Sequence, residues 1–524
     1  MPAYNNLDTI AAYGDVAAAQ PFDVRSLSAQ RLEQLRVPIA AGLTFCYGAA
    51  PVDATHIDAF QQLADEHELI AKYRELLSGA VINTGESRPV LHHLLRGEPI
   101  GPVTYRDRDQ GAFYRQQREA FAAFATRVRS GQEVGATGKA FRTVVQIGIG
   151  GSDLGPRALY LALREWVATQ PDATTLQARF VSNVDPDDAA AVLADLDFET
   201  TLFVVVSKSG TTQETLTNQQ FVAELVQRAG HSFDPLAHTV AVTSQTSPMA
   251  KNSGYRAAFY IDDYVGGRYS ATSAVGGVIL SLALGPQVFE RLLAGAAEAD
   301  AAALEPKVEA NAALLDALIG VYLRNVLGLQ TTAVLPYSQA LSRFPAHLQQ
   351  LDMESNGKSV NRDGGPVDYE TGPIVFGEPG TNGQHSFYQL LHQGTTVVPL
   401  QFIGFHTSQR GQDTEFDGST SQTKLNANLA AQIVAFARGK SDANPNKTFA
   451  GGRPSTVIVG RSLTPEALGA LLAHYENKVM FQGFTWNVNS FDQEGVQLGK
   501  VLTKEILGGK PGAELTAAGR LLGI

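Results

Sequence analysis

Residues 202–212 read Leu-Phe-Val-Val-Val-Ser-Lys-Ser-Gly-Thr-Thr, an apolar run that ends in a cluster of hydroxyl side chains. The Val-rich run at 202–206 is typical of a strand that is buried on both faces of a parallel sheet. A segment with helical spacing, 213–228, follows directly. Similar apolar runs lie at 143–149, 178–181 and 239–242. This alternation predicts βαβ units and a doubly wound sheet.

A second alternation of the same kind follows residue 284. A helical stretch over 288–328 leads to an expected strand at 331–335 and an expected helix at 342–356. Further expected elements are strands at 374–377, 396–405 and 456–459 and a long helix at 464–481. The sequence therefore predicts an α/β fold with two consecutive doubly wound, mostly parallel sheet domains. Residues 1–110 read as helices and loops.

The composition excludes several classes of function. The chain has 524 residues, with 41 Lys and Arg against 52 Asp and Glu, and its formal net charge of −11 argues against a general nucleic-acid binder. The single cysteine, Cys46, excludes an internal disulfide framework and a multi-cysteine metal site, and it suits a reducing cytoplasm. No secretion signal is expected in residues 1–20, and the longest weakly polar stretch, 274–285, is too short to span a membrane.

The first candidate site is the glycine-rich stretch 147–155, Ile-Gly-Ile-Gly-Gly-Ser-Asp-Leu-Gly, between an expected strand and a helix. Glycines let backbone amides approach an anion closely, and a helix N-terminus carries partial positive charge. A dinucleotide fingerprint needs a third glycine at position 153, which is Asp153, so an NAD site is disfavoured. A tight turn without a ligand is the alternative.

The second candidate is the cluster Ser207 to Thr212 at the end of an expected strand. Ligands of open α/β sheets bind at the carboxyl ends of the strands. Four hydroxyls, the Lys208 ammonium and a helix N-terminus match what a phosphate dianion requires. Helix capping by Ser and Thr is the alternative.

The third candidate is the expected helix that ends near Gly357. Gln350 and Glu354 are four residues apart and so point the same way on a helix, next to the apolar stripe of Phe344, Leu348 and Leu351. A carboxylate in this place is suited to act as a general base, and a solvated surface charge is the alternative.

Three further clusters carry weaker signals. His385 follows a glycine-rich loop, and Arg268 follows two glycines, as a fixed cation at a close backbone approach would. Gln493 and Lys500 are seven residues apart and would share one face if the segment were helical. For each cluster a loop, surface-charge or capping role is the alternative.

Several resemblances to known motifs fail. Residues 357–359, Gly-Lys-Ser, would end a nucleotide P-loop, but the required glycine at position 352 is Asp352. The pair at 67–68, His-Glu, would begin a zinc-protease motif, but position 71 is Ala71. His92 and His93 are neighbours that cannot face one metal from a helix, so surface or capping histidines are expected there.

Taken together, the set of motifs resembles the glucose-6-phosphate isomerase (phosphoglucose isomerase) family. The matching segments are IGIGGSDLGP from Ile147, SKSGTTQET from Ser207, GGRYS from Gly266, MESNGK from Met353, GTNGQHSFYQLLHQGT from Gly380 and NSFDQEGVQLGK from Asn489. They occur in the family's order and span about 350 residues. The resemblance implies the reversible aldose–ketose isomerisation of glucose 6-phosphate and fructose 6-phosphate, with a place in glycolysis and gluconeogenesis.

The resemblance also implies roles for the candidate residues. Glu354 aligns with the base that moves a proton between C2 and C1 of the open-chain sugar through a cis-enediol(ate), and Arg268 with the cation that stabilises the enediolate. His385 aligns with the residue that opens the pyranose ring, with Lys500 as its proton-transfer partner. The residues aligned with the phosphate cradle are Ser207, Lys208, Ser209 and Thr212. Those aligned with the rest of the pocket are Gly151, Ser152, Gln350 and Gln493.

The family implies no metal and no nucleotide cofactor, because the transferred proton lies α to a carbonyl and is already acidified. It works as a homodimer in which the equivalent of His385 reaches into the neighbouring active site. The expected division of the chain is an N-terminal helical segment at 1–110 that packs on the second domain, a first sugar-isomerase domain at 111–285, a second at 286–505 and a tail at 506–524.

The chain departs from the family pattern near the expected pocket. It carries Ser209-Gly210 where many members have Thr-Phe, Ala271-Thr272 where many have Leu-Trp, and Glu494 where many have Trp. No catalytic group is lost, but the loss of bulk suggests the hypothesis of relaxed specificity, for example toward mannose 6-phosphate. Two other readings are an isomerase of another sugar phosphate and a sugar-phosphate sensor without catalysis; a sensor would be expected to lack the base or the cation.

Overall fold

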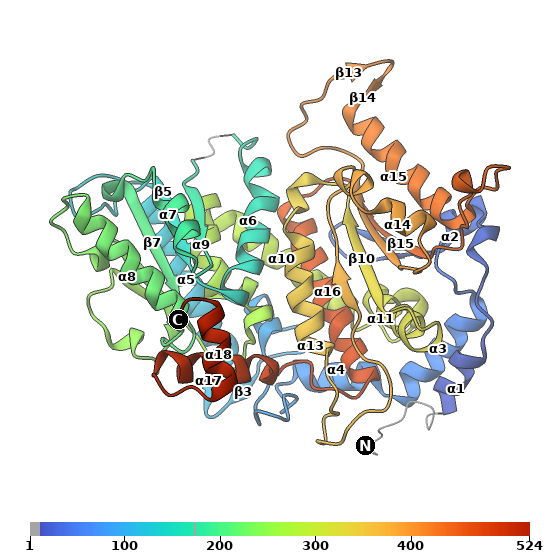
Figure 1. Ribbon diagram of the computed structural model, residues 1–524, viewed down its shortest axis with the longest axis horizontal. Helices are drawn as coiled ribbons and strands as arrows, with labels where there is room; N and C mark the ends of the chain where they lie inside the picture. The colour runs from blue at the N-terminus through green and yellow to red at the C-terminus, as the bar shows by residue number, and fades with distance from the viewer. Residues whose placement is uncertain (1–10, 172–173) are drawn as a thin grey trace.

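The computed structural model describes residues 11–171 and 174–524 and arranges them around two sheets, one in each half of Figure 1. The first sheet has five strands in the order β6-β5-β7-β8-β9, and every neighbouring pair is parallel. Its strands are β5 (Thr143–Ile147), β6 (Gln177–Val181), β7 (Thr201–Val206), β8 (Thr239–Ser244) and β9 (Ala257–Ile261).

The central strand of this sheet explains why the apolar runs were decisive. All six residues of β7 are buried, because helices cover both faces of the sheet. The edge strand β9 was not predicted from the sequence. Three of its five residues are only half-buried, and its run Ala-Ala-Phe-Tyr-Ile is short and mixed. An edge strand therefore lacks the strong apolar signal that a central strand carries.

The second sheet has six strands in the order β1-β2-β15-β12-β10-β11. Its strands are β1 (Arg36–Pro38), β2 (Thr44–Cys46), β10 (Thr331–Pro336), β11 (Ile374–Phe376), β12 (Leu400–Phe405) and β15 (Ser455–Gly460). The last four are parallel to their neighbours, and β2 pairs antiparallel with β15. The expectation of only helices and loops in residues 1–110 is therefore wrong at β1 and β2. Each is three residues long and is stabilised by its partner strand rather than by its own pattern.

The sheets and the helices between them confirm the predicted α/β class. The shorter strands form two hairpins, β3 (Thr104–Tyr105) with β4 (Arg108–Asp109) and β13 (Glu415–Phe416) with β14 (Ser419–Thr420). The helices are α1 (Ala11–Ala18), α2 (Ala29–Gln34), α3 (Ala54–Glu66), α4 (Leu69–Leu77), α5 (Gln110–Arg129), α6 (Leu154–Val167), α7 (Pro186–Leu193), α8 (Gln213–Arg228), α9 (Ala274–Leu284), α10 (Pro286–Ala302), α11 (Ala312–Val321), α12 (Phe344–Leu348), α13 (Glu354–Asn356), α14 (Tyr388–Gln393), α15 (Ser421–Arg438), α16 (Pro465–Thr485), α17 (Gln497–Leu507) and α18 (Ala513–Leu521).

The predicted helix at 342–356 is interrupted. A π-helical turn, η12 (Gln349–Met353), lies between α12 and α13. A second π-helical turn, η10 (Tyr322–Val326), continues α11. Single π-helical turns inside helices are uncommon and frequently lie at functional sites.

Helix α16 is the central element of the second half. It packs on α10 and α11, and almost every residue along it is buried. It nevertheless carries charged side chains. Glu476 forms an ion pair of 2.6 Å with Arg96, whose Nε lies 2.5 Å from Asp300 of α10. All three side chains are buried, so the loss of one partner would leave an uncompensated charge in the core.

His92 and His93 lie in this same interior, so the expectation of surface or capping histidines is wrong. Both are almost fully buried, and burial lowers the pKa of His93 to about 3, with the Arg96 charge acting in the same direction. The His92 ring stacks on the Tyr269 ring with centroids 4.7 Å apart. The two histidines are neutral packing residues that link the N-terminal segment to the loop of Arg268.

Candidate active site

The predicted phosphate cluster forms a compact loop at the carboxyl end of β7. The Ser207 and Thr212 hydroxyls lie 2.9 Å apart, and the Thr212 amide donates to the Ser207 hydroxyl at 3.4 Å. Gly210 has φ +68°, and a Cβ there would lie 3.0 Å from Ser247. Thr212 is the N-cap residue of α8, but its side chain makes no capping bond. The loop thus directs hydroxyls and a helix N-terminus to one edge of the sheet.

Lys208 extends from this loop toward the segment that leads to Arg268. Its Nζ donates to the Val265 carbonyl at 3.3 Å and lies 3.9 Å from an oxygen of Asp263. Burial lowers the pKa of Lys208, while Asp263 favours its charged form. The ammonium is therefore held at the mouth of the cradle with one weak counter-charge.

The two glycine-rich turns of the first half touch each other. Gly151 lies in the short turn η4 (Gly150–Ser152) and Gly267 in η8 (Gly267–Thr272). A Cβ on Gly151 would lie 2.2 Å from the Gly267 carbonyl oxygen, so the backbones can meet only because residue 151 has no side chain. Gln350 approaches the same turn, because a Cβ on Gly150 would lie 3.4 Å from its amide nitrogen.

Arg268 is held by protein groups on two of its three nitrogens. Its Nε donates to the Ser355 hydroxyl at 2.6 Å. Its Nη2 donates to the carbonyl oxygens of Ser490 at 2.5 Å and Asp492 at 2.9 Å. The side chain is 1% exposed. These bonds fix the plane of the guanidinium. Among the described residues, Nη1 donates no hydrogen bond.

The Nη1 atom of Arg268 faces Glu354. The Arg268 Nη1 and Glu354 Oε2 atoms are 3.6 Å apart, and Oε2 has no hydrogen-bond partner among the described residues. Glu354 begins α13, directly after the π-helical turn. A carboxylate and a fixed cation are thus placed side by side at the junction of the two halves of the molecule.

Gln493 lies near Arg268 because it follows Asp492 in the chain. The Asp492 carbonyl accepts a hydrogen bond from Arg268, and the Asp492 carboxylate pairs with Lys358. Lys500 lies on α17, which starts only at Gln497 after a short 3-10 turn. The hypothesis that Gln493 and Lys500 share one helix face is therefore wrong. The intervening turn ends any helical register between them.

Glu354 and His385 lie near opposite ends of the parallel strands of the second sheet. The turn before Glu354 adjoins β11, whose Val375 amide contacts Met353 Sδ at 3.4 Å. His385 follows the carboxyl end of β10, where the Gly380 amide donates to the Pro336 carbonyl at 2.9 Å. Val375 pairs with Thr332, so these two contacts are four residues apart along β10, about 13 Å. In Figure 1, α14, which follows His385, is drawn above α13 in this half.

The structure therefore brings together only part of the predicted set. It gathers Glu354, Arg268, Gly151 and Gln350, and it places the Ser207–Thr212 loop on the same edge of the first sheet as Gly151. His385 and Lys500 are exposed, and within residues 11–171 and 174–524 no hydrogen bond or ion pair joins either to Glu354 or Arg268.

Sequence reasoning missed the groups that hold the guanidinium. Ser355 carried a usable signal, because it is a hydroxyl directly beside the candidate base. The carbonyls of Ser490 and Asp492 carried none, because every residue has a carbonyl. The part of the chain that the structure describes contains no cluster of three or more His, Cys, Asp or Glu that could hold a metal ion.

A family model described as phosphoglucose isomerase matches residues 47–516. The chain belongs to the phosphoglucose isomerase family. This confirms the resemblance and, with it, the predicted activity: the chain is an isomerase that interconverts glucose 6-phosphate and fructose 6-phosphate.

Similar proteins cover nearly the whole chain. The glucose-6-phosphate isomerase of Treponema pallidum (strain Nichols) is 58% identical over 97% of this chain and 96% of that protein. That of Treponema denticola is 57% identical over 93% of this chain and 92% of that protein. The crystal structure of a glucose-6-phosphate isomerase from Chlamydia trachomatis superposes with a TM-score of 0.91 at 43% identity and covers 99% of both chains. No helix in the described ranges has the length and apolar character to cross a bilayer.

Proposed function

We propose that Glu354 is the base of the isomerisation and Arg268 the cation that stabilises its intermediate. One observation carries this proposal: Glu354 Oε2 lies 3.6 Å from Arg268 Nη1, the guanidinium nitrogen that donates no hydrogen bond among the described residues. A cation fixed beforehand in a buried place stabilises developing negative charge more effectively than solvent does.

The proton transfer balances with these two groups alone. The Glu354 carboxylate takes the proton from C2 of the open-chain aldose, and the C–H electron pair becomes the C1–C2 double bond. The carbonyl oxygen at C1 becomes the enediolate oxygen, and its charge lies beside Arg268 Nη1. Glu354 then returns its proton to C1, and the proton of the C2 hydroxyl passes to the C1 oxygen, so the C2 oxygen becomes the ketose carbonyl and the C1 oxygen a hydroxyl. The step needs neither a metal nor a redox cofactor.

The substrate phosphate binds in the loop at the end of β7. Ser207, Ser209 and Thr212 supply hydroxyls, and Lys208 supplies the positive charge. The position of this loop at a helix N-terminus supports the assignment. We assign the sugar contacts to the turn of Gly151 and Ser152, to Gln350 and to Gln493.

Ring opening is assigned to His385 and Lys500, with His385 of the partner subunit completing each site of a homodimer. The location of His385 across the sheet from Glu354 supports this arrangement, because one strand length separates them within a chain. The His385 side chain is exposed, as a group that reaches into a neighbouring subunit must be.

The C-terminal hairpin of α17 and α18 also supports a dimer. It leaves large apolar side chains in solvent, among them Leu498 at 69%, Leu507 at 62% and Leu521 at 87% exposed. No residue of α17 is buried in the single chain. An apolar surface of this kind on a folded protein is typical of an interaction face.

We also propose the division of the chain at 110, 285 and 505 and a cytoplasmic location. The first sheet lies wholly within 111–285, and β10, β11, β12 and β15 lie within 286–505. The N-terminal segment packs on the second sheet through β1 and β2. The single free cysteine, Cys46, supports the location.

The test is a coupled assay of fructose 6-phosphate conversion, without added metal and with chelator, for the wild type and Glu354→Gln. The loss of a positioned base is expected to lower kcat by about 10²- to 10⁴-fold. Glu33→Gln is the matched control, because Glu33 is an exposed carboxylate on α2, far along the chain from the site. A Glu354→Gln variant that keeps wild-type activity would show that another group is the base.

A further inference from the structure

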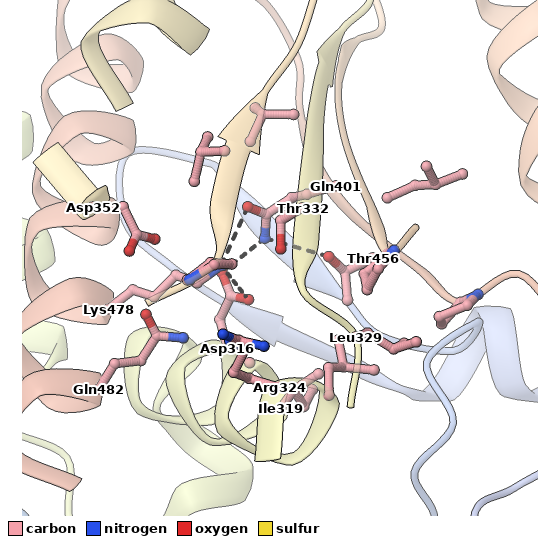
Figure 2. A pocket seen from close by; sticks show the side chains of 18 of the residues that line it. Asp316, Ile319, Arg324, Leu329, Thr332, Asp352, Gln401, Thr456, Lys478 and Gln482 are labelled. Atoms are coloured by element: carbon pink, nitrogen blue, oxygen red, sulfur yellow. Dashed lines mark hydrogen bonds and ion pairs between the residues drawn. The ribbon is translucent and has the colours of Figure 1, made fainter. Parts of the chain in front are cut away.

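A small cavity with a few polar side chains lies beside the turn that precedes Glu354. Its volume is about 50 Å³, and it lies at the amino ends of β10, β12 and β15, between α11, α16 and the π-helical turn η12. Figure 2 shows the side chains of Asp352, Lys478 and Asp316 directed into one end of it. Nothing in the proton transfer described above uses these groups.

Lys478 is the cation of this cavity, and Asp316 of α11 is its direct partner. Lys478 Nζ lies 3.0 Å from Asp316 Oδ1 and donates to Gln401 Oε1 at 3.4 Å. Asp316 Oδ2 also accepts from Gln401 at 2.8 Å and lies 3.1 Å from His474 Nε2. Asp316 is therefore fully partnered.

Asp352 is the unpartnered carboxylate of the same cavity. It is 8% exposed, and its Oδ1 atom has no hydrogen-bond partner among the described residues. Burial raises the pKa of Asp352 to about 7, with Asp316 acting in the same direction and the Lys478 charge in the opposite one. Gln482 lines the same cavity and also carries a buried, unpartnered oxygen. The polar atoms and the volume are sufficient for water to bridge these groups.

The position of Asp352 in the chain connects the cavity to the catalytic group. Asp352 and Glu354 are two residues apart, and side chains at that spacing point to opposite sides of a helix. Asp352 faces the cavity, and Glu354 faces Arg268 at 3.6 Å. A shift of the Asp352 carboxylate therefore moves the η12 turn, which orients Glu354.

We propose that Asp352 is a positioning residue, whose burial in the cavity that Lys478 and Gln482 also line sets the π-helical turn so that Glu354 faces Arg268. The proposal rests on the proposed role of Glu354 as the base. It explains why a carboxylate is kept in the interior, where an apolar residue would avoid the cost of desolvation.

The test compares Asp352→Asn with Asp316→Asn, for kcat, KM and melting temperature. The two variants remove one carboxylate each from around the same lysine, but only Asp352 lies on the turn of the base. Asp352→Asn is expected to lower kcat about 10- to 100-fold with little change in KM, as the loss of a group that orients a catalytic residue does. Asp316→Asn is expected to lower the melting temperature without that loss of kcat.

The pH profile separates positioning from stability. The charged groups that act on Asp352 are Lys478 of α16 and Asp316 of α11, and Tyr475 of α16 and Arg324 of η10 line the same cavity. Protonation of Asp352 removes the charge that Lys478 attracts, so wild-type kcat is expected to fall as the pH drops through about 7. Asp352→Asn lacks this charge at every pH, so this part of the profile is expected to be absent.

A wild-type kcat and pH profile in folded Asp352→Asn would overturn the proposal, and so would an equal loss of kcat in Asp316→Asn. If Asp352→Asn does not fold, Asp352→Glu keeps the charge and moves the carboxylate by one methylene. A wild-type kcat in that variant would overturn the proposal as well. Activity that survives Glu354→Gln is a separate result, because it contradicts the base assignment whatever Asp352 does.

Discussion

Arg268 shows how one buried side chain acquires a function from its neighbours. Three hydrogen bonds to Ser355, Ser490 and Asp492 fix its guanidinium. Tyr269, the next residue, also bonds the Ser355 hydroxyl at 2.9 Å, and its ring packs against those of both His92 and Phe491. The cation therefore cannot turn toward solvent, and its free nitrogen stays beside Glu354.

Ser355→Ala tests this restraint. It removes the acceptor of Arg268 Nε and leaves a buried donor unpaired, which costs about 1–3 kcal/mol. If Arg268 stabilises the enediolate, we expect kcat to fall about tenfold or more, with a smaller change in KM. Steady-state kinetics with fructose 6-phosphate measures both.

Ser490→Ala is the matched control for Ser355→Ala. The Ser490 hydroxyl donates to Asn356 at 2.6 Å, whereas Arg268 uses only the Ser490 carbonyl, which the substitution keeps. Equal losses of kcat in both variants would mean that general packing, and not the bond to Nε, supports the activity.

At the scale of elements, the segment from α12 to α13 combines a packed apolar stripe with the proposed base. Phe344, Leu348 and Leu351 are buried along it, as the predicted apolar stripe requires. The π-helical turn changes the register before Glu354, which the sequence pattern did not show. His347 of the same segment is 1% exposed, and neither ring nitrogen has a partner among the described residues.

His347 gives this element a dependence on pH. Burial lowers the pKa of His347 from 6.5 to about 4, so the folded protein keeps it neutral where the unfolded chain already binds a proton. The stability that this residue contributes is complete above pH 6.5 and is lost as the pH falls through about 4. Relative to His347→Phe, we expect the wild type to lose about 3 kcal/mol between these limits.

Urea unfolding of both proteins at a series of pH values from 7.5 to 4.5 checks this prediction. The difference between the two free energies of unfolding should change steadily below pH 6.5. A constant difference over the whole range would show that His347 is protonated in the folded state as readily as in the unfolded chain.

At the scale of the whole molecule, the two halves contribute opposite ends of their strands to the candidate site. The first half supplies the carboxyl ends of its strands, where β5 and β7 lead into the Gly151 turn and the Ser207 loop. The second half supplies the end of a helix, Glu354, which adjoins the amino end of its sheet. His385 follows the carboxyl end of β10, which supports the proposal that a second subunit completes the site.

Mixing two inactive variants tests the shared site. In a mixed dimer of Glu354→Gln and His385→Ala, one site carries both substitutions and the other carries neither. Random exchange of subunits makes about half of the dimers mixed. Each mixed dimer has one intact site out of two, so about a quarter of the wild-type activity is expected to return. The measurement is the coupled assay after joint unfolding and refolding of the two variants.

The control mixes two other proteins in the same way. One carries both Glu354→Gln and His385→Ala in a single chain, and the other is the wild type. That mixture forms no new kind of intact site, so its activity should not exceed that of the wild-type chains present. If the first mixture stays inactive although mixed dimers form, His385 serves the site of its own chain.

Much of the fold was predictable because its signals are local. The buried runs of β5, β7, β8, β10, β12 and β15 and the helix α8 lie where the apolar patterns indicated. The edge strand β9 and the short strands β1 and β2 were missed, because their partners rather than their residues stabilise them. The glycine turns and the hydroxyl cluster were predictable for the same reason as the central strands, since each is one continuous segment.

The sequence by itself determined the α/β class and the candidate phosphate loop, since each depends on a few adjacent residues, and its resemblance to the family supplied the candidate base and cation. Only the tertiary structure decided that Arg268, Glu354 and the segment of Ser490 meet, because contacts between distant segments arise from packing. It also decided that Asp352 and His347 are buried, and desolvation is what shifts their pKa values. The location of His385 across the sheet from Glu354 follows from strand direction, which no motif records.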